Sequence, residues 1–391
     1  MSFRALRFVQ LVLVLVAAAW FVWWRPVEPR TGPTPVALDD GWALSTPAAE
    51  GFDGTALTTA IERVLDGPYN VHSVLVERHG RIVAEYYQGG RDRSVYALVS
   101  IRRSFGPSTL HDVRSIGKSV TSLLYGIALA DGKVPPPDAY LSTVYPQLQD
   151  VAAENASRVR VRDLLDMSSG LDWTEGAPGI NDELRLFSRR DLPLYVLKRP
   201  MATAPGTAFN YNGGGTALLA DMIASGTGDD IERYAARRLF VPLGIRHWDW
   251  VKDLHGRPMA FNGLRLRPRD LLKIGRLAQD HGRWHGAQIV PAAWMDDSWS
   301  RGRTTGVSDF TYRAQWWAGT ADWHGRRLAW HAGFGNGGQR VFVVPELDIV
   351  MVTTAGAYDE DQTAIAVNRL VRAVVASVPE AASKRADRQR R

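Results

Sequence analysis

Hydrophobic residues form short apolar runs near both ends of the chain, and turn residues separate the runs. One pair of runs flanks His79 and Gly80, and a second pair is separated by residues 345–348. Apolar runs of this length, bounded by turn residues, are typical of β-strands in hairpins. The predicted strands are 74–76, 82–84, 341–344 and 349–352.

The middle of the chain has a different period, because its apolar residues recur at the spacing of helix faces. Examples lie at 164–165, 218–219 and 271–277, and a closing helix is predicted over 364–375. Strands at both ends that enclose a helical middle predict an α/β (α+β) fold. We expect one mixed sheet, built from both chain ends and flanked by helices, with an inserted, mostly helical subdomain over about 115–285.

The first 25 residues have the pattern of a membrane-targeting segment. Residues 8–24 are apolar with one exception and follow Arg4 and Arg7, so the positive end is expected to stay inside. We expect an uncleaved single-pass anchor in the cell inner membrane over 1–25, with the rest of the protein in the periplasm. The alternative is a signal peptide cleaved near 17–19, which would leave a secreted protein.

Composition sets three further boundaries. A proline-rich stretch over 26–44 predicts an extended linker, because proline excludes a helix there. The main globular domain is predicted over 45–378, and a basic tail over 379–391 is predicted to be disordered. The chain ends carry most of the net charge of +6, and no basic stripe runs through the body. We therefore expect no nucleic-acid partner.

The residue types present exclude several chemistries. A chain of 391 residues with 45% hydrophobic residues can bury a full core, and the absence of cysteine excludes disulfides, thiolate nucleophiles and iron–sulfur clusters. His281 and His285 are four residues apart, but glycines follow both and no glutamate follows His281, so no metal site is expected. Residues 117–119 imitate only the end of a phosphate loop, and no cofactor is expected.

One serine–lysine pair is a candidate for nucleophilic catalysis. Of six lysines, only Lys118 has a serine three residues before it, Ser115. A helix is predicted over 115–129, and its first turn holds the pair, so the amine can reach the hydroxyl. We expect burial to lower the pKa of Lys118 until the amine can remove the serine proton. The Ser115 amide, unpaired at the helix start, is free to face an oxyanion.

Four segments in order carry a wider resemblance, one of them containing Ser115-Ile116-Gly117-Lys118. They are 111–122, 161–171, 205–211 and 335–345. Over about 50–378 the chain resembles the serine hydrolases of the penicillin-binding protein and class C β-lactamase superfamily, especially the branch of 6-aminohexanoate-dimer hydrolases and related esterases. The resemblance implies a β-lactamase/transpeptidase-like fold. It also implies that Tyr211 completes a proton relay to the leaving group.

Two departures from the family pattern bear on the substrate. Lactamase members carry Tyr-x-Asn, whereas this chain has Tyr211-Asn212-Gly213, and their Lys-Thr-Gly is replaced by His331-Ala332-Gly333. The lysine and hydroxyl that hold a β-lactam carboxylate are therefore absent from their places, although Arg340 is a possible substitute. His331 is equally well explained as a packed histidine. The residues assigned to the substrate pocket and oxyanion hole are Asn212, His331, Gly333 and Phe334.

These observations predict a serine hydrolase without metal or cofactor. Its substrate is expected to be a small-molecule ester or amide, cleaved through an acyl-enzyme on Ser115 with Lys118 and Tyr211 as proton-transfer groups. One alternative is a peptidoglycan DD-peptidase or a β-lactamase, which the residues at 331–333 disfavour. The alternative from another class is a non-catalytic, membrane-tethered protein that binds the cell wall.

Overall fold

The computed structural model describes residues 26–175 and 181–380, together with Arg7, Gln10, Val12, Leu13 and Trp20. The predicted anchor or signal over 1–25 lies outside the described residues, apart from these isolated positions, and so does the predicted tail from residue 381 onward. Within the described part of the chain, no helix combines the length and the apolar character that crossing a bilayer requires.

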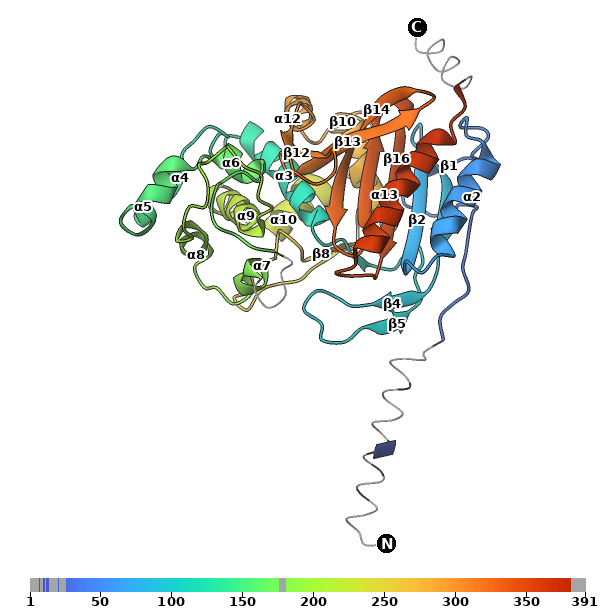
Figure 1. Cartoon of the computed structure of the whole chain (residues 1–391), viewed down its shortest axis with the longest axis horizontal. Coiled ribbons are helices and arrows are strands. Elements are labelled where there is room, and N and C mark those ends of the chain that lie inside the picture. The colour runs from blue at the N-terminus through green and yellow to red at the C-terminus, as the bar shows by residue number, and fades with distance from the viewer. Residues whose placement is uncertain are drawn as a thin grey trace.

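A nine-stranded mixed sheet forms the centre of the molecule (Figure 1). Its strands, in spatial order, are β1 (Ala43–Leu44), β3 (Arg81–Tyr87), β2 (Val71–Arg78), β16 (Ile349–Ala355), β15 (Gln339–Val344), β14 (Arg326–Gly335), β13 (Trp316–Trp323), β12 (Thr311–Arg313) and β11 (Arg303–Thr304). Strand β1 runs parallel to β3, and the other neighbours are antiparallel. The N-terminal strand β2 pairs with the C-terminal strand β16, with Leu75 opposite Val352. The prediction of one sheet built from both chain ends is thus confirmed.

The predicted hairpin at His79 and Gly80 joins β2 to β3. Both turn residues have positive φ angles, 54° and 77°. Two consecutive positive φ values are the mark of a type I′ turn, whose twist matches that of the flanking strands, and glycine at the second position adopts this conformation without steric cost.

Helices cover both faces of the sheet, which explains why the central strands β2, β15 and β16 are buried along their whole length. Along β15, Val341 and Val343 face one core cluster and Phe342 and Val344 face the other. The first face packs against α3 (Ile116–Ala130) and α11 (Pro268–Gln279), and the second against α2 (Gly54–Leu65) and α13 (Asp361–Ala376).

The inserted helical region lies beside the sheet in Figure 1. Its helices are α4 (Leu141–Val144), α5 (Gln149–Arg158), α6 (Val161–Leu165), α7 (Asp182–Leu186), α8 (Leu192–Leu197), α9 (Gly213–Thr227) and α10 (Ile231–Ala235), with η1 (Pro146–Leu148) and η2 (Ala236–Phe240). Helices α3 and α11, at the two ends of the predicted subdomain, pack on the sheet itself, so the insertion is shorter than 115–285.

Short elements complete the fold. They are β4 (Gly90–Asp92), β5 (Ile101–Arg103), β6 (His111–Asp112), β7 (Asp249–Trp250), β8 (Leu264–Leu266), β9 (Arg283–Trp284), β10 (Ala287–Gln288), α12 (Ala292–Ser298) and η3 (Pro345–Leu347). Strand β6 pairs with β8 directly before α3 begins. This pairing fixes the chain that leads into the first turn of α3.

Residues 26–44 are extended, as expected, but they contact the body along much of their length. Thr31 pairs with Tyr87, and Trp42 is buried in the core. Arg269 in α11 donates hydrogen bonds to the Val36 carbonyl and to Asp40. Proline forbids a helix in this stretch but allows edge pairing, so the described contacts begin well before residue 45, where we expected the body to start.

Candidate active site

Ser115 lies directly before the first residue of α3. Most of the segment around it is buried, but the serine is partly exposed. Arg114 precedes it with a φ of 52°, a left-handed conformation that is rare for a residue with a side chain. Among the described residues the Ser115 amide finds no acceptor, whereas the amides of the next three residues donate to carbonyls just before them. The serine thus presents a hydroxyl and a free amide at a helix N-terminus.

Lys118 is fully buried one turn into α3 and contacts four polar groups. Its Nζ atom lies 3.2 Å from Ser115 Oγ, 3.0 Å from Glu183 Oε2 and 3.2 Å from the Phe261 carbonyl oxygen. Glu175 Oε2 is 3.9 Å away. The predicted contact between the serine and the lysine is present, and two glutamates accompany it.

The expected depression of the lysine pKa is wrong. Burial does favour the neutral amine, but the adjacent Glu183 carboxylate opposes it, and the pKa of Lys118 lies above its ordinary value. The sequence indicates that Lys118 is buried, but it does not show which carboxylates the fold brings to its amine. In the resting protein Lys118 is therefore an ammonium ion.

Glu183 and Glu175 were not among the residues predicted from the sequence. Glu183 lies in the first turn of α7 and accepts a hydrogen bond of 2.7 Å from Asn262 Nδ2. Glu175 accepts hydrogen bonds from Trp173 Nε1, at 2.8 Å, and from the Gly213 amide. Burial, together with the charge of Glu183, raises the pKa of Glu175 to about 8. Nothing in their spacing from Lys118 indicates that the fold brings them to its amine.

Tyr211 stands beside this group, just before α9. The Lys118 amine lies 4.7 Å from the centroid of its ring, and the Ser115 hydroxyl interacts with the phenol. The ring belongs to an aromatic cluster with Phe209, Tyr312 and Trp317. Burial raises the pKa of Tyr211, so the phenol keeps its proton at neutral pH. The structure thus brings together all three residues predicted to be catalytic.

Asn212 has a different place from the one predicted for it. Its side chain accepts a hydrogen bond of 3.0 Å from the Gly215 amide and caps the N-terminus of α9. Only 2% of the residue is exposed. The sequence predicts this side chain in the substrate pocket, whereas in the structure its oxygen caps the helix that follows Tyr211.

Gly333 and Phe334 lie where β14 passes the first turn of α3. A Cβ atom on Gly333 would be 3.1 Å from Ile116 Cγ2 and from Ser119 Oγ, so the glycine permits the close approach of strand and helix. Strand β14 pairs with β13 only as far as Ala332, but with β15 as far as Gly335. Among the described strands, the edge of β14 that faces β13 therefore has no partner over 333–335.

The side chains of His331 and Arg340 are engaged elsewhere. The His331 ring stacks on Trp299 at a centroid distance of 4.4 Å, and burial lowers its pKa to about 4, so the ring is neutral. Its described contacts do not include Ser115, Lys118 or Tyr211. Arg340 packs over the Phe334 ring and donates to Asn368 Oδ1 and to the Gly335 carbonyl. Of the two interpretations of His331, the geometry agrees with the packed histidine.

The carboxyl of Glu175 provides a test of this charge arrangement. Because its pKa is about 8, it is protonated at neutral pH, and ionisation above pH 8 places a second negative charge beside the Lys118 ammonium. That charge holds the lysine proton more firmly. We expect kcat/KM for a p-nitrophenyl ester to fall above pH 8, and Glu175→Gln to remove this fall while retaining neutral-pH activity. A pH profile that is unchanged in the variant contradicts the assignment.

Comparison with known proteins places this geometry in a family. The Beta-lactamase family model matches residues 70–376. The 6-aminohexanoate-dimer hydrolase of Paenarthrobacter ureafaciens is 25% identical over 308 residues, which are 73% of each chain. The D-aminopeptidase of Brucella abortus is 26% identical over 201 residues, 51% of this chain and 36% of that protein.

Solved structures agree on the fold. A penicillin-binding protein homologue from Caulobacter crescentus superposes with a TM-score of 0.64 at 15% identity, covering 90% of this chain and all of the other. EstCE1, a hydrolase with promiscuous acyltransferase activity, has a TM-score of 0.63 at 15% identity and covers 83% of this chain and all of its own. With the family match spanning most of its length, the chain belongs to the beta-lactamase family and is a serine hydrolase.

Proposed function

We propose that the protein cleaves an ester or amide bond through a covalent acyl-enzyme on Ser115. The observation that carries the proposal is the contact of a partly exposed serine hydroxyl, at a helix N-terminus, with a buried lysine 3.2 Å away. A non-catalytic protein that binds the cell wall has no need of this contact, nor of Tyr211 beside it. The contact therefore favours an enzyme over the non-catalytic, membrane-tethered alternative.

The proton path must take account of the ammonium state of Lys118. As Ser115 Oγ attacks the substrate carbonyl, its proton passes to Lys118 Nζ, and a lysine proton moves to the Glu183 carboxylate 3.0 Å away. Tyr211 then donates its hydroxyl proton to the leaving group, and the proton held by Lys118 and Glu183 returns to the phenolate. In deacylation, water replaces Ser115 as the attacking group and the same groups act in reverse.

The developing negative charge on the substrate oxygen needs hydrogen-bond donors. The Ser115 amide has no acceptor among the described residues, and we assign the second donor to the edge of β14 at Phe334, where pairing with β13 has ended. The close packing of Gly333 against Ile116 and Ser119 brings this edge to the first turn of α3, which begins directly after the serine. Backbone amides on two rigid elements need no rearrangement during the reaction.

Labelling with a fluorophosphonate tests the nucleophile. We expect covalent modification of the native protein and recovery of the label on the peptide containing Ser115, because the probe reports an activated serine. Ser122→Ala is a matched control on the same helix, since the Ser122 hydroxyl is buried and has no hydrogen-bond partner among the described residues. Labelling that survives Ser115→Ala would falsify the assignment.

The substrate is proposed to be an ester or amide without a carboxylate beside the scissile bond. Neutral His331 and the methyl of Ala332 stand where lactamases carry the groups that hold this anion, and the guanidinium of Arg340 lies against Phe334. Losing a charge-assisted hydrogen bond costs about 1.5–3 kcal/mol, or roughly ten- to a hundredfold in rate.

We therefore expect short-chain p-nitrophenyl esters to be turned over readily, and kcat/KM for nitrocefin to be lower by about a hundredfold or more. Both substrates are assayed on one preparation across pH 6 to 9. If nitrocefin matches the ester, a carboxylate-binding group exists that has not been identified. The lactamase or DD-peptidase alternative then replaces the esterase and amidase proposal.

The site of action is proposed to be outside the cytoplasm. The support is the apolar run over 8–24 after two arginines, which favours a single-pass anchor in the inner membrane over a cleaved signal. Fractionation of the full chain with membranes, and release of an active protein on deletion of residues 1–25, is the expected result. A mature N-terminus near residues 17–20 would instead establish cleavage and secretion.

A further inference from the structure

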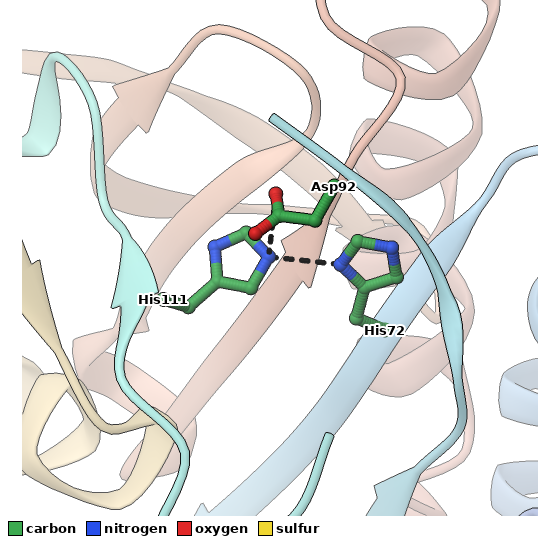
Figure 2. A group of neighbouring side chains, drawn as sticks. All are labelled: His72, Asp92 and His111. Atoms are coloured by element: carbon green, nitrogen blue, oxygen red, sulfur yellow. Dashed lines mark hydrogen bonds and ion pairs between the residues drawn. The ribbon is translucent and has the colours of Figure 1, made fainter. Parts of the chain in front are cut away.

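Two histidines and an aspartate converge at a buried point away from the serine. His72 comes from β2, Asp92 from β4 and His111 from β6, and each is at most 2% exposed (Figure 2). His72 Nδ1 lies 2.8 Å from His111 Nε2, and Asp92 Oδ1 lies 4.0 Å from the same His111 atom. One ligand atom from each residue fits within 4.8 Å of the others. We refer to the three as the His72–Asp92–His111 cluster.

The outer nitrogen of each ring faces an acceptor. His111 Nδ1 lies 3.0 Å from the Asp112 carbonyl oxygen, and His72 Nε2 lies 3.2 Å from Asn70 Oδ1. The orientation of the Asn70 amide is fixed, because its Oδ1 accepts from the Arg91 amide and its Nδ2 donates to the Arg91 carbonyl. Each ring therefore donates its N–H outward.

This arrangement leaves the inner nitrogens without protons. If His72 donates through Nε2 and His111 through Nδ1, the lone pairs of His72 Nδ1 and His111 Nε2 face each other at 2.8 Å, beside the Asp92 carboxylate. Three electron-pair donors that converge in a buried place repel one another unless a cation lies among them. A metal ion is bound in proteins by neutral imidazole nitrogens whose other N–H is held by an oxygen acceptor.

We propose that the His72–Asp92–His111 cluster binds a divalent first-row transition metal ion, with Zn²⁺ as the best match. Two imidazoles and one carboxylate are a ligand set of zinc sites. Zinc–ligand distances of 2.0–2.2 Å in a tetrahedron place ligand atoms about 3.3 Å apart. The present separations of 2.8 and 4.0 Å reach that value by side-chain shifts of less than about 1 Å.

Residues around the cluster contact Asp92 and His72 and hold these side chains in place. Tyr358 donates a hydrogen bond of 2.6 Å to Asp92 Oδ1, and the Arg103 guanidinium lies 3.4 Å from Asp92 Oδ2. A Cβ atom on Gly356 would lie 2.6 Å from the His72 ring, so the glycine backbone closes directly over that ring. Asn70 and Tyr358, which contact members of the cluster, also line a hollow on the surface.

The position of the cluster indicates a structural role for an ion bound there. It ties β2 of the central sheet to β4 and β6, and His111 stands four residues before Ser115. An ion at this point would hold the segment that leads into α3 without contacting substrate. The sequence offered no sign of this, because the three ligands come from distant segments with no common motif.

Metal titration of the full chain tests the proposal. After dialysis against a chelator, the wild-type protein should take up one equivalent of Zn²⁺, measured by calorimetry and by elemental analysis. It should also take up Co²⁺, with visible ligand-field absorption. Asp92→Asn, which is nearly isosteric, should weaken Zn²⁺ binding by about a hundredfold or more, because it removes the charged ligand. The Tm of the wild type should rise with added Zn²⁺ and that of the variant should not.

The control is His281→Gln. His281 pairs with Asp296 at 2.7 Å on the surface, so it resembles the cluster in chemistry but lies outside it. This variant should bind Zn²⁺ like the wild type. If Asp92→Asn does not fold, Asn70→Ala serves instead, with an expected loss of about tenfold from freeing the His72 ring.

Two results would overturn the proposal. One is wild-type protein that binds no Zn²⁺, in which case the two rings share a proton. The other is a stoichiometry that falls equally in His281→Gln, which would place the ion on the surface. Neither readout depends on hydrolase activity, so the metal proposal and the proposed function fail separately.

Discussion

Replacing Lys118 with alanine is expected to lower kcat/KM for a p-nitrophenyl ester by a factor of about 10³ or more. Without the amine, the Ser115 proton loses its route to Glu183, because that carboxylate reaches the serine only through Lys118. The variant should also lose stability, by about 3–5 kcal/mol, because the Glu183 carboxylate then lies in a largely buried site without its cation.

Lys118→Arg separates these two effects. The guanidinium keeps the positive charge beside both glutamates but does not release a proton near neutral pH. We expect this variant to regain most of the stability in urea unfolding and none of the activity. Activity in Lys118→Arg within tenfold of the wild type would show that the residue acts by charge alone, and the proton path through it would have to be abandoned.

The second large effect is expected at Arg269, in the first turn of α11. This side chain is 2% exposed and bonds both oxygens of the buried Glu85, at 2.6 and 2.7 Å, as well as Asp40. Arg269→Met should lower the free energy of unfolding by about 3–5 kcal/mol, because it leaves the Glu85 carboxylate buried without its partner. Urea denaturation followed by circular dichroism measures the change.

Two comparisons sharpen that experiment. Arg327→Met removes an exposed pair with Asp309 and should cost under about 1 kcal/mol. Adding Glu85→Leu to Arg269→Met should recover part of the loss, since the orphaned charge is then gone. If Arg269→Met lowers the free energy of unfolding by no more than Arg327→Met does, the contacts of Arg269 do not hold residues 26–44 to the body.

The fold could be predicted from the sequence because its signals are local. Apolar runs at 341–344 and 349–352 and the turn at His79 and Gly80 each specify their own strand or hairpin. The contacts of 26–44 could not be predicted, because their partners, such as Tyr87 and Arg269, are distant in the chain. Polar contacts between remote segments leave no trace in local periodicity.

Part of the candidate site could likewise be predicted from the local sequence, and part of it could not. Ser115 and Lys118 are one helical turn apart, so their contact follows from helix geometry. Glu175 and Glu183 come from the inserted helical region, and they reverse the expected direction of the Lys118 pKa. Placing a charged neighbour requires the tertiary fold, and a pKa depends on neighbours as much as on burial.

The pairing of β2 with β16 has a consequence for how the protein folds. Residues 71–78 and 349–355 are nearly the whole domain apart in sequence, yet they are neighbours at the centre of the sheet. During synthesis, β2 cannot pair with β16 until almost all of the chain has been made. The inserted helices rest on short-range contacts and can form earlier. A shortened chain that lacks β16 leaves β2 as an open, apolar edge, which is the kind of surface that drives aggregation.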